Sequence, residues 1–170
     1  TTVTNLISLR RKFWTKYKRE PYVSHVVVAG HVDNPVRLRN FLIQTIFGNI
    51  ANFRHSECAE MHVVVMFESV PCADTLEILL DTKLGSRVFY VVGSCFDRRA
   101  LDKADVASAK AFILLADVVS ITENSQLDMK IILSTFPGLS HVRSNIGEND
   151  HPNCSVYVQL GTSRHRHLLR

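Results

Sequence analysis

The stretch VFYVVGSCFDRRALDKADVASAKAFILLAD, residues 88–117, indicates the fold of the whole chain. It opens with the apolar run Val88–Val92, which stops at Gly93, and it closes with a second apolar run, Ala111–Ala116. Residues 98–106, between the two runs, have the composition of a short helix. Two uninterrupted apolar runs joined by a helix predict a βαβ unit whose strands are buried on both faces. Such a unit needs neighbouring strands and helices over both sides of the sheet.

Three further apolar runs predict the neighbouring strands. They cover residues 25–30, 62–67 and 154–160. Because helical segments separate the runs, the chain alternates strand and helix throughout. This order predicts an α/β protein with a Rossmann-like, doubly wound parallel sheet.

The first two predicted helices have clear start and stop signals. Asp33 and Asn34 offer a capping side chain, and Pro35 follows at the first helical position. The inward stripe of this helix is Leu38, Phe41, Leu42, Thr45 and Ile46, with Gly48 as its end. The second helix should start near Ala73 and stop at Gly85. Its inward residues are predicted to be Leu76, Leu79, Leu80 and Leu84.

A third main helix is predicted from Glu123 to Phe136. Its apolar face should comprise Met129, Ile132, Leu133 and Phe136. Pro137 and Gly138 are expected to end it, because proline removes a helical hydrogen bond. Residues 138–153 should then form a long exposed loop.

The net charge of +4 is unevenly distributed over the 170 residues. Residues 1–20 hold six basic residues and one acid, and the rest of the chain holds 14 basic and 15 acidic residues. We therefore interpret residues 1–21 as a basic linker and residues 22–170 as one domain, ending in a truncated basic helix from Thr162. The linker could contact nucleic acid, anionic lipid or an acidic partner, and a solvated leader helix explains the pattern equally well. No apolar run reaches the roughly 18–20 residues that span a bilayer.

The cysteines and histidines show no metal-binding or disulfide pattern. Four cysteines stand far apart without a C-x-x-C pair, so we expect reduced thiols in a cytosolic setting. His25, His31 and His62 are not spaced with cysteines or carboxylates as metal ligands are, and we expect partly buried or surface imidazoles.

A nucleotide would bind beyond the carboxyl ends of the strands, after Gly30, Glu68 and Gly93. The dinucleotide fingerprint G-x-G-x-x-G is degraded at the first turn, which reads GHVDNP over residues 30–35. Glu68 alone matches the ribose-binding position. No nucleophile elbow, P-loop or H-E-x-x-H motif is present, so we expect a protein that is not an enzyme. A nucleotide-binding regulatory domain or an NAD-dependent oxidoreductase fragment remains the alternative.

The ordered set of these segments resembles the RCK (regulator of potassium conductance) domain. Residues 92–106, Ala109 and the strand at 111–116 look like its core. Residues 25–32 are similar to the start of the first RCK domain in eukaryotic large-conductance, BK-type potassium channels. Gln159 and the sequence His167-Leu168-Leu169 also resemble that branch.

The resemblance implies a Rossmann-like fold and a cytosolic gating function in a potassium channel. In that family, RCK domains form a ring, four subunits in the full-length protein, that couples ligand binding to the pore. The implied partners are the pore domain, other RCK domains and potassium ions passing through the pore, with no nucleic acid. Residues 1–21 would be the linker from the last pore helix, next to the membrane. We expect only weak self-association of this piece.

The resemblance also identifies candidate positions for calcium, the regulatory ligand that it implies, and no other cofactor. The positions that match the prokaryotic calcium ligands are Ser94, Gln159 and Gly161, none of which carries a carboxylate. In the BK-type branch, acids before the second strand contribute to calcium sensing, and Glu57 and Glu60 match them here. The magnesium-site acids of that branch fall at Val64 and Phe89, so we expect that site to be absent.

Overall fold

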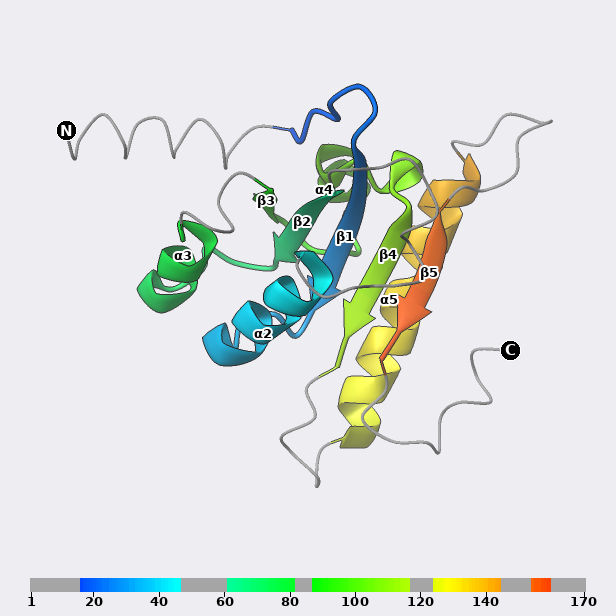
Figure 1. Cartoon of the computed structure of the whole chain (residues 1–170). Helices are drawn as coiled ribbons and strands as arrows, with labels where there is room; N and C mark the ends of the chain where they lie inside the picture. Colours follow the sequence, from blue (N-terminus) through cyan, green and yellow to red (C-terminus); the bar gives the residue numbers. More distant parts are fainter. Residues whose placement is uncertain (1–15, 47–60, 82–86, 117–123, 145–153, 160–170) are drawn as a thin grey trace.

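The computed structural model describes residues 16–46, 61–81, 87–116, 124–144 and 154–159, with the backbone alone for 46 and 124–131. Its five strands form one parallel sheet in the order β3-β2-β1-β4-β5 (Figure 1). The strands are β1 Ser24–Gly30, β2 Met61–Phe67, β3 Val88–Val92, β4 Ala111–Leu115 and β5 Ser155–Val158. The predicted doubly wound α/β fold is therefore confirmed.

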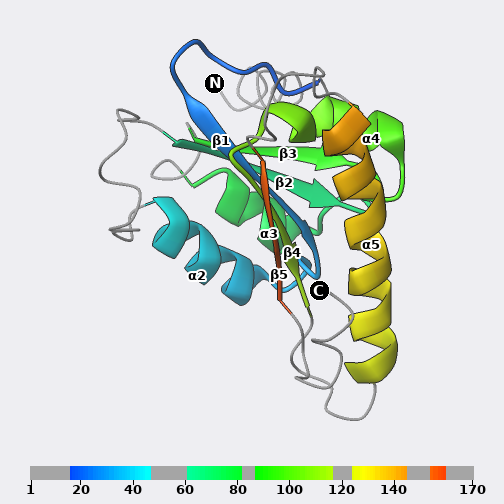
Figure 2. The ribbon, with the colours of Figure 1, turned by 90° about the vertical axis from the view of Figure 1, so that its right-hand side faces the viewer.

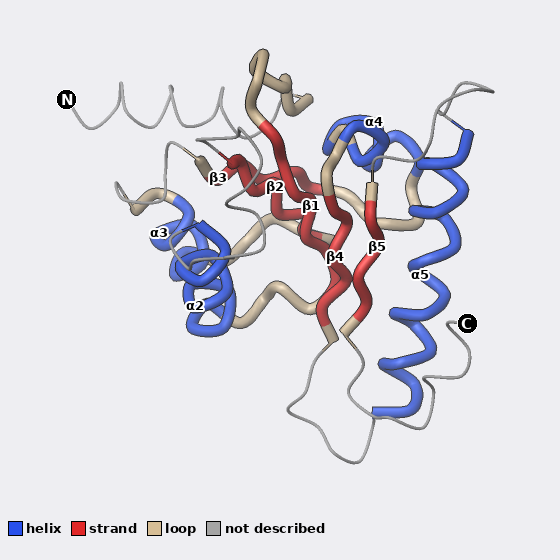
Figure 3. Tube along the Cα trace, turned by 45° about the vertical axis from the view of Figure 1, so that its right-hand side comes forward, coloured by secondary structure: helices blue, strands red, loops and turns tan. Residues whose placement is uncertain are grey.

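Helices cover both faces of the sheet (Figures 2 and 3). On one face lie α2, Pro35–Ile46, and α3, Ala73–Leu79. On the other lie α4, Arg98–Ala104, the short 3₁₀ helix η2, Val106–Ser108, and α5, Asn124–Ser144. None of the described helices is long and apolar enough to cross a membrane.

The central βαβ unit spans most of the sheet. β3 is the edge strand on one side, whereas β4 lies beyond β2 and β1. Along the chain, β2 and β3 are added on one side of β1, and the connection through α4 then places β4 on the other side of β1. The reversal places the topological switch point of the sheet between β1 and β4, where this fold class binds ligands.

The core consists of two layers, one on each side of β1. Val27 and Ala29 pack with the residues under α4 and α5, whereas Val26 and Val28 pack with those under α2 and α3. All four side chains are buried. This two-sided burial explains why the strand is an unbroken apolar run rather than an alternating one.

The start of α2 follows the prediction. The side-chain oxygen of Asn34 accepts a hydrogen bond of 3.1 Å from the backbone N–H of Arg37, and Pro35 opens the helix. Leu38 and Leu42 are buried as expected.

The end of α3 differs from the prediction. The helix stops at Leu79, and Leu80 is 36% exposed instead of inward. Leu84, Gly85 and Gly48 lie outside the described residues.

The prediction for α5 was wrong at its C-terminal end. The helix continues through Pro137 and Gly138 to Ser144. His141 and Val142, predicted to lie in an exposed loop, are buried, so tertiary packing compensates for the hydrogen bond that proline cannot make. Residues 145–153 lie outside the described part.

The predicted apolar face of α5 is only partly correct. Ile132 is buried, but Leu133 is 51% exposed and Phe136 is 59% exposed. The side chain of Met129 is outside the described residues. The helix buries a different stripe than the one predicted, because its C-terminal half also packs on the domain.

Candidate functional site

A pocket of about 350 Å³ opens at the switch point of the sheet. It lies where β1 and β4 end and α2 begins, at the place where a doubly wound sheet binds ligands. The residues that line it are His31, Val32, Arg37, Leu38, Asn40, Phe41, Gln44, Leu115, Ala116 and Gln159. The ligand crevice was predicted beyond Gly30, Glu68 and Gly93; the pocket lies after Gly30, and Glu68 and Gly93 are not among its lining residues.

Gly30, the last residue of β1, directly precedes the first residues that line this pocket. Its φ of +96° lies in the region that favours glycine, and a Cβ there would come within 2.4 Å of the Leu115 carbonyl oxygen. The next backbone N–H, that of His31, donates to the same oxygen over 2.8 Å. This close approach ties the carboxyl ends of β1 and β4 together.

The first turn of α2 is poorly suited to a nucleotide phosphate. Phosphates bind free N–H groups at a helix N-terminus, through a glycine-rich turn. Here Asn34 already accepts from an N–H of the first turn, Pro35 has none to offer, and Val32 is buried at 2% exposure where the fingerprint has glycine. The turn therefore closes the position that a pyrophosphate would occupy.

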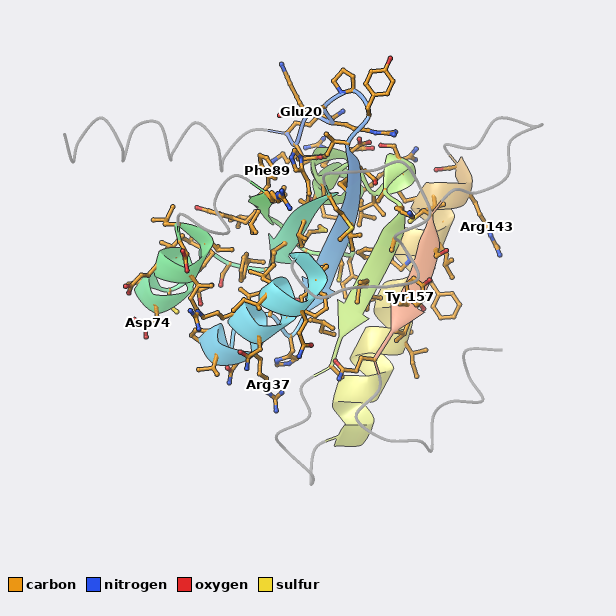
Figure 4. All side chains as sticks on the ribbon, viewed as in Figure 1. Glu20, Arg37, Asp74, Phe89, Arg143 and Tyr157 are labelled. Atoms are coloured by element: carbon orange, nitrogen blue, oxygen red, sulfur yellow. The ribbon has the colours of Figure 1, made fainter. Side chains whose placement is uncertain are left out.

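The polar lining of the pocket includes one guanidinium and three side-chain amides. Arg37 lies on the exposed side of α2, as Figure 4 shows, and Asn40, Gln44 and Gln159 supply the amides. The described lining residues include no carboxylate. Calcium needs several carboxylate oxygens, so this part of the pocket lacks the charge to hold it.

Two of the three prokaryotic-type calcium positions, Gln159 and Ser94, lie within the described residues, and one of these two lines the pocket. Gln159 does so, whereas Ser94 does not; the Ser94 hydroxyl accepts a hydrogen bond of 3.2 Å from the Phe96 N–H in its own turn. Gly161, Glu57 and Glu60 lie outside the described residues. Within the described ranges, no three histidine, cysteine or acidic residues group together as metal ligands.

The magnesium-type positions carry apolar side chains. Val64 is fully buried in the layer under α4 and α5. Phe89 packs against the rings of Tyr17 and His62, with centroid separations of 5.1 and 4.9 Å. Neither side chain offers an oxygen ligand.

A second polar cluster lies at the opposite, amino end of the strands. Tyr17, from the predicted linker, is 4% exposed, so the core begins before Pro21 rather than after it. His25 and His62 are 0% and 4% exposed, more deeply buried than the sequence suggested. The sequence signal for this cluster is modest: each histidine stands directly before a run of three valines, and one tyrosine stands between two lysines.

The family model described as "Calcium-activated potassium channel slowpoke-like RCK domain" matches residues 22–157. No curated protein sequence matches the chain.

Two solved structures share the fold. The human SLO3 gating ring has a TM-score of 0.57 and 14% identity, over 86% of this chain and 21% of that one. The GsuK RCK domain has a TM-score of 0.53 and 19% identity, over 98% of this chain and 28% of that one. The present chain thus spans between a fifth and a third of the length of these proteins.

Proposed function

Because this chain belongs to the calcium-activated potassium channel slowpoke-like RCK domain family, we propose that it is the cytosolic gating domain of a potassium channel. The match over residues 22–157 carries the proposal. The domain would act by binding and conformational coupling, with no reaction of its own. The closed phosphate position at Val32 and Pro35 argues against the alternative, a nucleotide-binding regulatory domain or an NAD-dependent oxidoreductase fragment.

The proposed route of coupling runs through the basic linker. Six basic residues within residues 1–20 suit a segment next to the anionic inner leaflet, between a pore helix and the domain. Tyr17 then joins the linker to the folded core, since its backbone N–H donates to the Lys103 carbonyl over 2.8 Å. Movement of the domain would be transmitted to the pore through this segment. Other RCK domains of a homotetrameric ring would be the remaining partners.

A channel chimera tests the gating role. The chain replaces the first RCK domain of a slowpoke-like channel, and potassium currents are recorded from excised patches. Leu42→Asp places a charge at a fully buried position of α2 and should abolish ligand-dependent opening. Val36→Asp is the matched control, because Val36 is 67% exposed on the same helix. Normal gating of the Leu42→Asp channel would show that the folded domain is not needed.

We further propose that the regulatory ligand is calcium and that Glu57 and Glu60 help to bind it. Two glutamates are too few for a complete site, so backbone carbonyls or acids of another domain would complete the coordination. Calorimetric titration of the chain with calcium should give a heat of binding that the Glu57→Gln/Glu60→Gln variant loses. Equal binding by both proteins would exclude these residues as the sensor.

The alternative functions, nucleotide binding and nucleic-acid binding, are tested with the same chain. Titration with NAD(H), NADP(H), ATP and ADP should give no binding at micromolar concentration, and binding of any of them would establish the nucleotide-dependent alternative. Binding to DNA or RNA should likewise be absent. If it occurs only with residues 1–20 present and weakens steeply with salt, the basic linker is a nucleic-acid contact.

A further inference from the structure

The pocket beside α2 opens on a part of the sheet that no described helix covers. On this face α2 and α3 lie over the side formed by β1, β2 and β3, whereas no described helix lies over the same face of β4 and β5 (Figures 1 and 2). The side chains there are only partly covered. Ile113 and Leu115 are half-buried, and Tyr157, paired with Ile113, is 53% exposed. A small molecule can therefore enter the pocket from the side of β5 without displacing a described helix.

Two elements on opposite sides of the switch point supply most of the polar lining. Arg37, Asn40 and Gln44 follow one another on α2 at intervals of three and four residues, so they lie on one side of the helix. From first to last they extend over about 10 Å of the helix axis. Gln159 stands directly after β5, where its backbone N–H donates to the Leu114 carbonyl over 2.9 Å. A ligand in the pocket would contact α2 and the end of β5 at once.

The most deeply buried lining residues are apolar. Val32, Leu38 and Ala116 are 2%, 2% and 4% exposed, and Phe41 and Leu115 are half-buried beside them. The polar residues of the described lining, by contrast, are all exposed. The pocket thus has an apolar interior and a polar rim, which suits an organic molecule with one polar end.

The charge of the lining favours an acid as that polar end. Arg37 brings a positive charge to the described lining, which contains no carboxylate; Asp33, exposed in the turn before α2, is not part of it. One guanidinium balances one negative charge, and its planar fork matches the two oxygens of a carboxylate. The side-chain N–H groups of Asn40, Gln44 and Gln159 can donate further hydrogen bonds to such a group.

We propose that this pocket binds a small organic monocarboxylate, with its carboxylate at Arg37 and its apolar body against Val32 and Leu115. The volume of about 350 Å³ lies at the small end of the roughly 300–1,000 Å³ that is common for ligand sites, so the body holds only a few carbons. A phosphate group is disfavoured, because the Asn34 cap and Pro35 close the first turn of α2.

Binding of the acid is a property of this domain, but its use as a regulatory signal rests on the function proposed above. By contacting both α2 and Gln159, the bound acid would favour arrangements that keep these two elements close together. The channel chimera tests the gating role independently. A negative result with the acid therefore contradicts the ligand assignment alone.

Titration with hexanoate tests the ligand class on the chain itself. Hexanoate should bind with a dissociation constant of about 1 mM or lower, the range that its few non-hydrogen atoms allow. Hexanamide has the same body without the charge, and acetate has the charge without the body, so each should bind roughly tenfold more weakly or worse. Inorganic phosphate should not displace hexanoate. Equal binding of hexanamide, displacement by phosphate, or no binding of hexanoate would each overturn the proposal.

Two arginines of α2 provide a variant and its matched control. Arg37→Gln keeps side-chain N–H donors but loses the charge, so it should weaken hexanoate binding roughly tenfold and leave hexanamide binding unchanged. Arg39→Gln, also exposed on α2 but outside the described lining, should keep the hexanoate affinity within about twofold. The same hexanoate affinity in both variants would show that Arg37 does not hold the carboxylate.

Methyl NMR spectra of the wild type locate the bound acid without any substitution. Hexanoate should shift the methyl signals of Val32 and Leu115, which line the pocket. It should leave in place the signals of Val88, in the edge strand β3. Shifts confined to methyl groups outside the pocket would overturn the proposal.

Discussion

Cys72 and Cys154 show how far local surroundings separate two residues of one kind. Cys72 is exposed and lies directly before α3. Its sulfur is 3.3 Å from the Thr75 hydroxyl, and this hydrogen bond is the main factor that lowers the pKa of the Cys72 thiol. Cys154 is buried, and burial raises its pKa to about 11. Since the thiolate is the nucleophile, the two cysteines should differ strongly in reactivity.

We predict that iodoacetamide at pH 7.5 alkylates Cys72 at least tenfold faster than Cys154, as measured by peptide mass spectrometry. Thr75→Val preserves the shape of the buried side chain but removes the hydrogen bond. It should slow the Cys72 reaction, because the variant loses the hydrogen bond that is the main factor lowering the pKa of this thiol. The Cys154 rate serves as an internal control for an intact fold. An unchanged Cys72 rate in the variant would show that the hydroxyl does not stabilise the thiolate.

At the scale of elements, α5 approaches the sheet very closely at Gly138. A Cβ at Gly138 would come within 2.5 Å of the Phe112 ring, which is fully buried in β4. Glycine thus lets the helix lie directly on this ring. The contact also explains why a Pro-Gly pair, ordinarily a stop signal, occurs inside the helix.

We predict that Gly138→Ala lowers the free energy of unfolding by about 1–3 kcal/mol, as overpacking does in other cores. Without the contact, the substitution would stabilise a helix by about 1 kcal/mol, so the sign of the change is diagnostic. Ser140→Ala, exposed on the same helix, is the control and should change the free energy by less than about 0.5 kcal/mol. Urea unfolding followed by circular dichroism measures the free energy of unfolding of the wild type and of both variants. A more stable Gly138→Ala protein would mean that α5 does not rest on Phe112.

The same elements show what the sequence could and could not predict. Strands such as β1 and β3 were predicted nearly to the residue, because two-sided burial requires unbroken apolar runs. The path of α5 beyond Pro137 was missed, since it depends on a contact with Phe112, 25 positions earlier in the chain. The pocket after Gly30 followed from strand ends, whereas the burial of Tyr17 depends on three separate strands that no local pattern connects. The calcium candidates Glu57 and Glu60 stay a prediction.

For the whole molecule, buried histidines should make stability depend on pH. Burial lowers the pKa of His25 and also that of His141, although Asp102, 3.4 Å from His141, partly opposes the shift. Both rings therefore bind a proton less readily in the folded protein than in the unfolded chain, where the pKa returns to the ordinary value of 6.5. Their contribution to stability is therefore present above pH 6.5 and is lost as the pH falls below it.

We predict that the free energy of unfolding decreases between pH 7.5 and 5.5, with a limiting slope of about 1.4 kcal/mol per pH unit for each proton taken up on unfolding. Urea titrations at several pH values measure it. The His25→Gln/His141→Gln variant should give a flatter curve over the same range. If wild type and variant have the same pH profile, these histidines are already protonated in the folded protein.

Self-association of the chain should be weak. A stable interface generally buries more than about 1,000 Å² in total. The large exposed apolar residues of the described surface stand mostly alone on different elements, namely Tyr22, Val36, Val70, Leu80, Phe96 and Tyr157. Leu133 and Phe136 are the exception, because they lie one turn apart on the outward side of α5 and are 51% and 59% exposed. Two side chains make a contact too small for a stable ring.

We therefore predict a monomer in light scattering at about 10 μM, with weak association at higher concentration through α5. Leu133→Ser/Phe136→Ser should remove the concentration dependence of the sedimentation coefficient, because it eliminates the paired apolar side chains and leaves the buried Ile132 in place. Val36→Ser, at an isolated exposed valine on α2, should not change it. A stable tetramer or octamer at low micromolar concentration would show that the elements within this chain suffice to build the ring. Association that survives the double substitution would place the contact elsewhere than on α5.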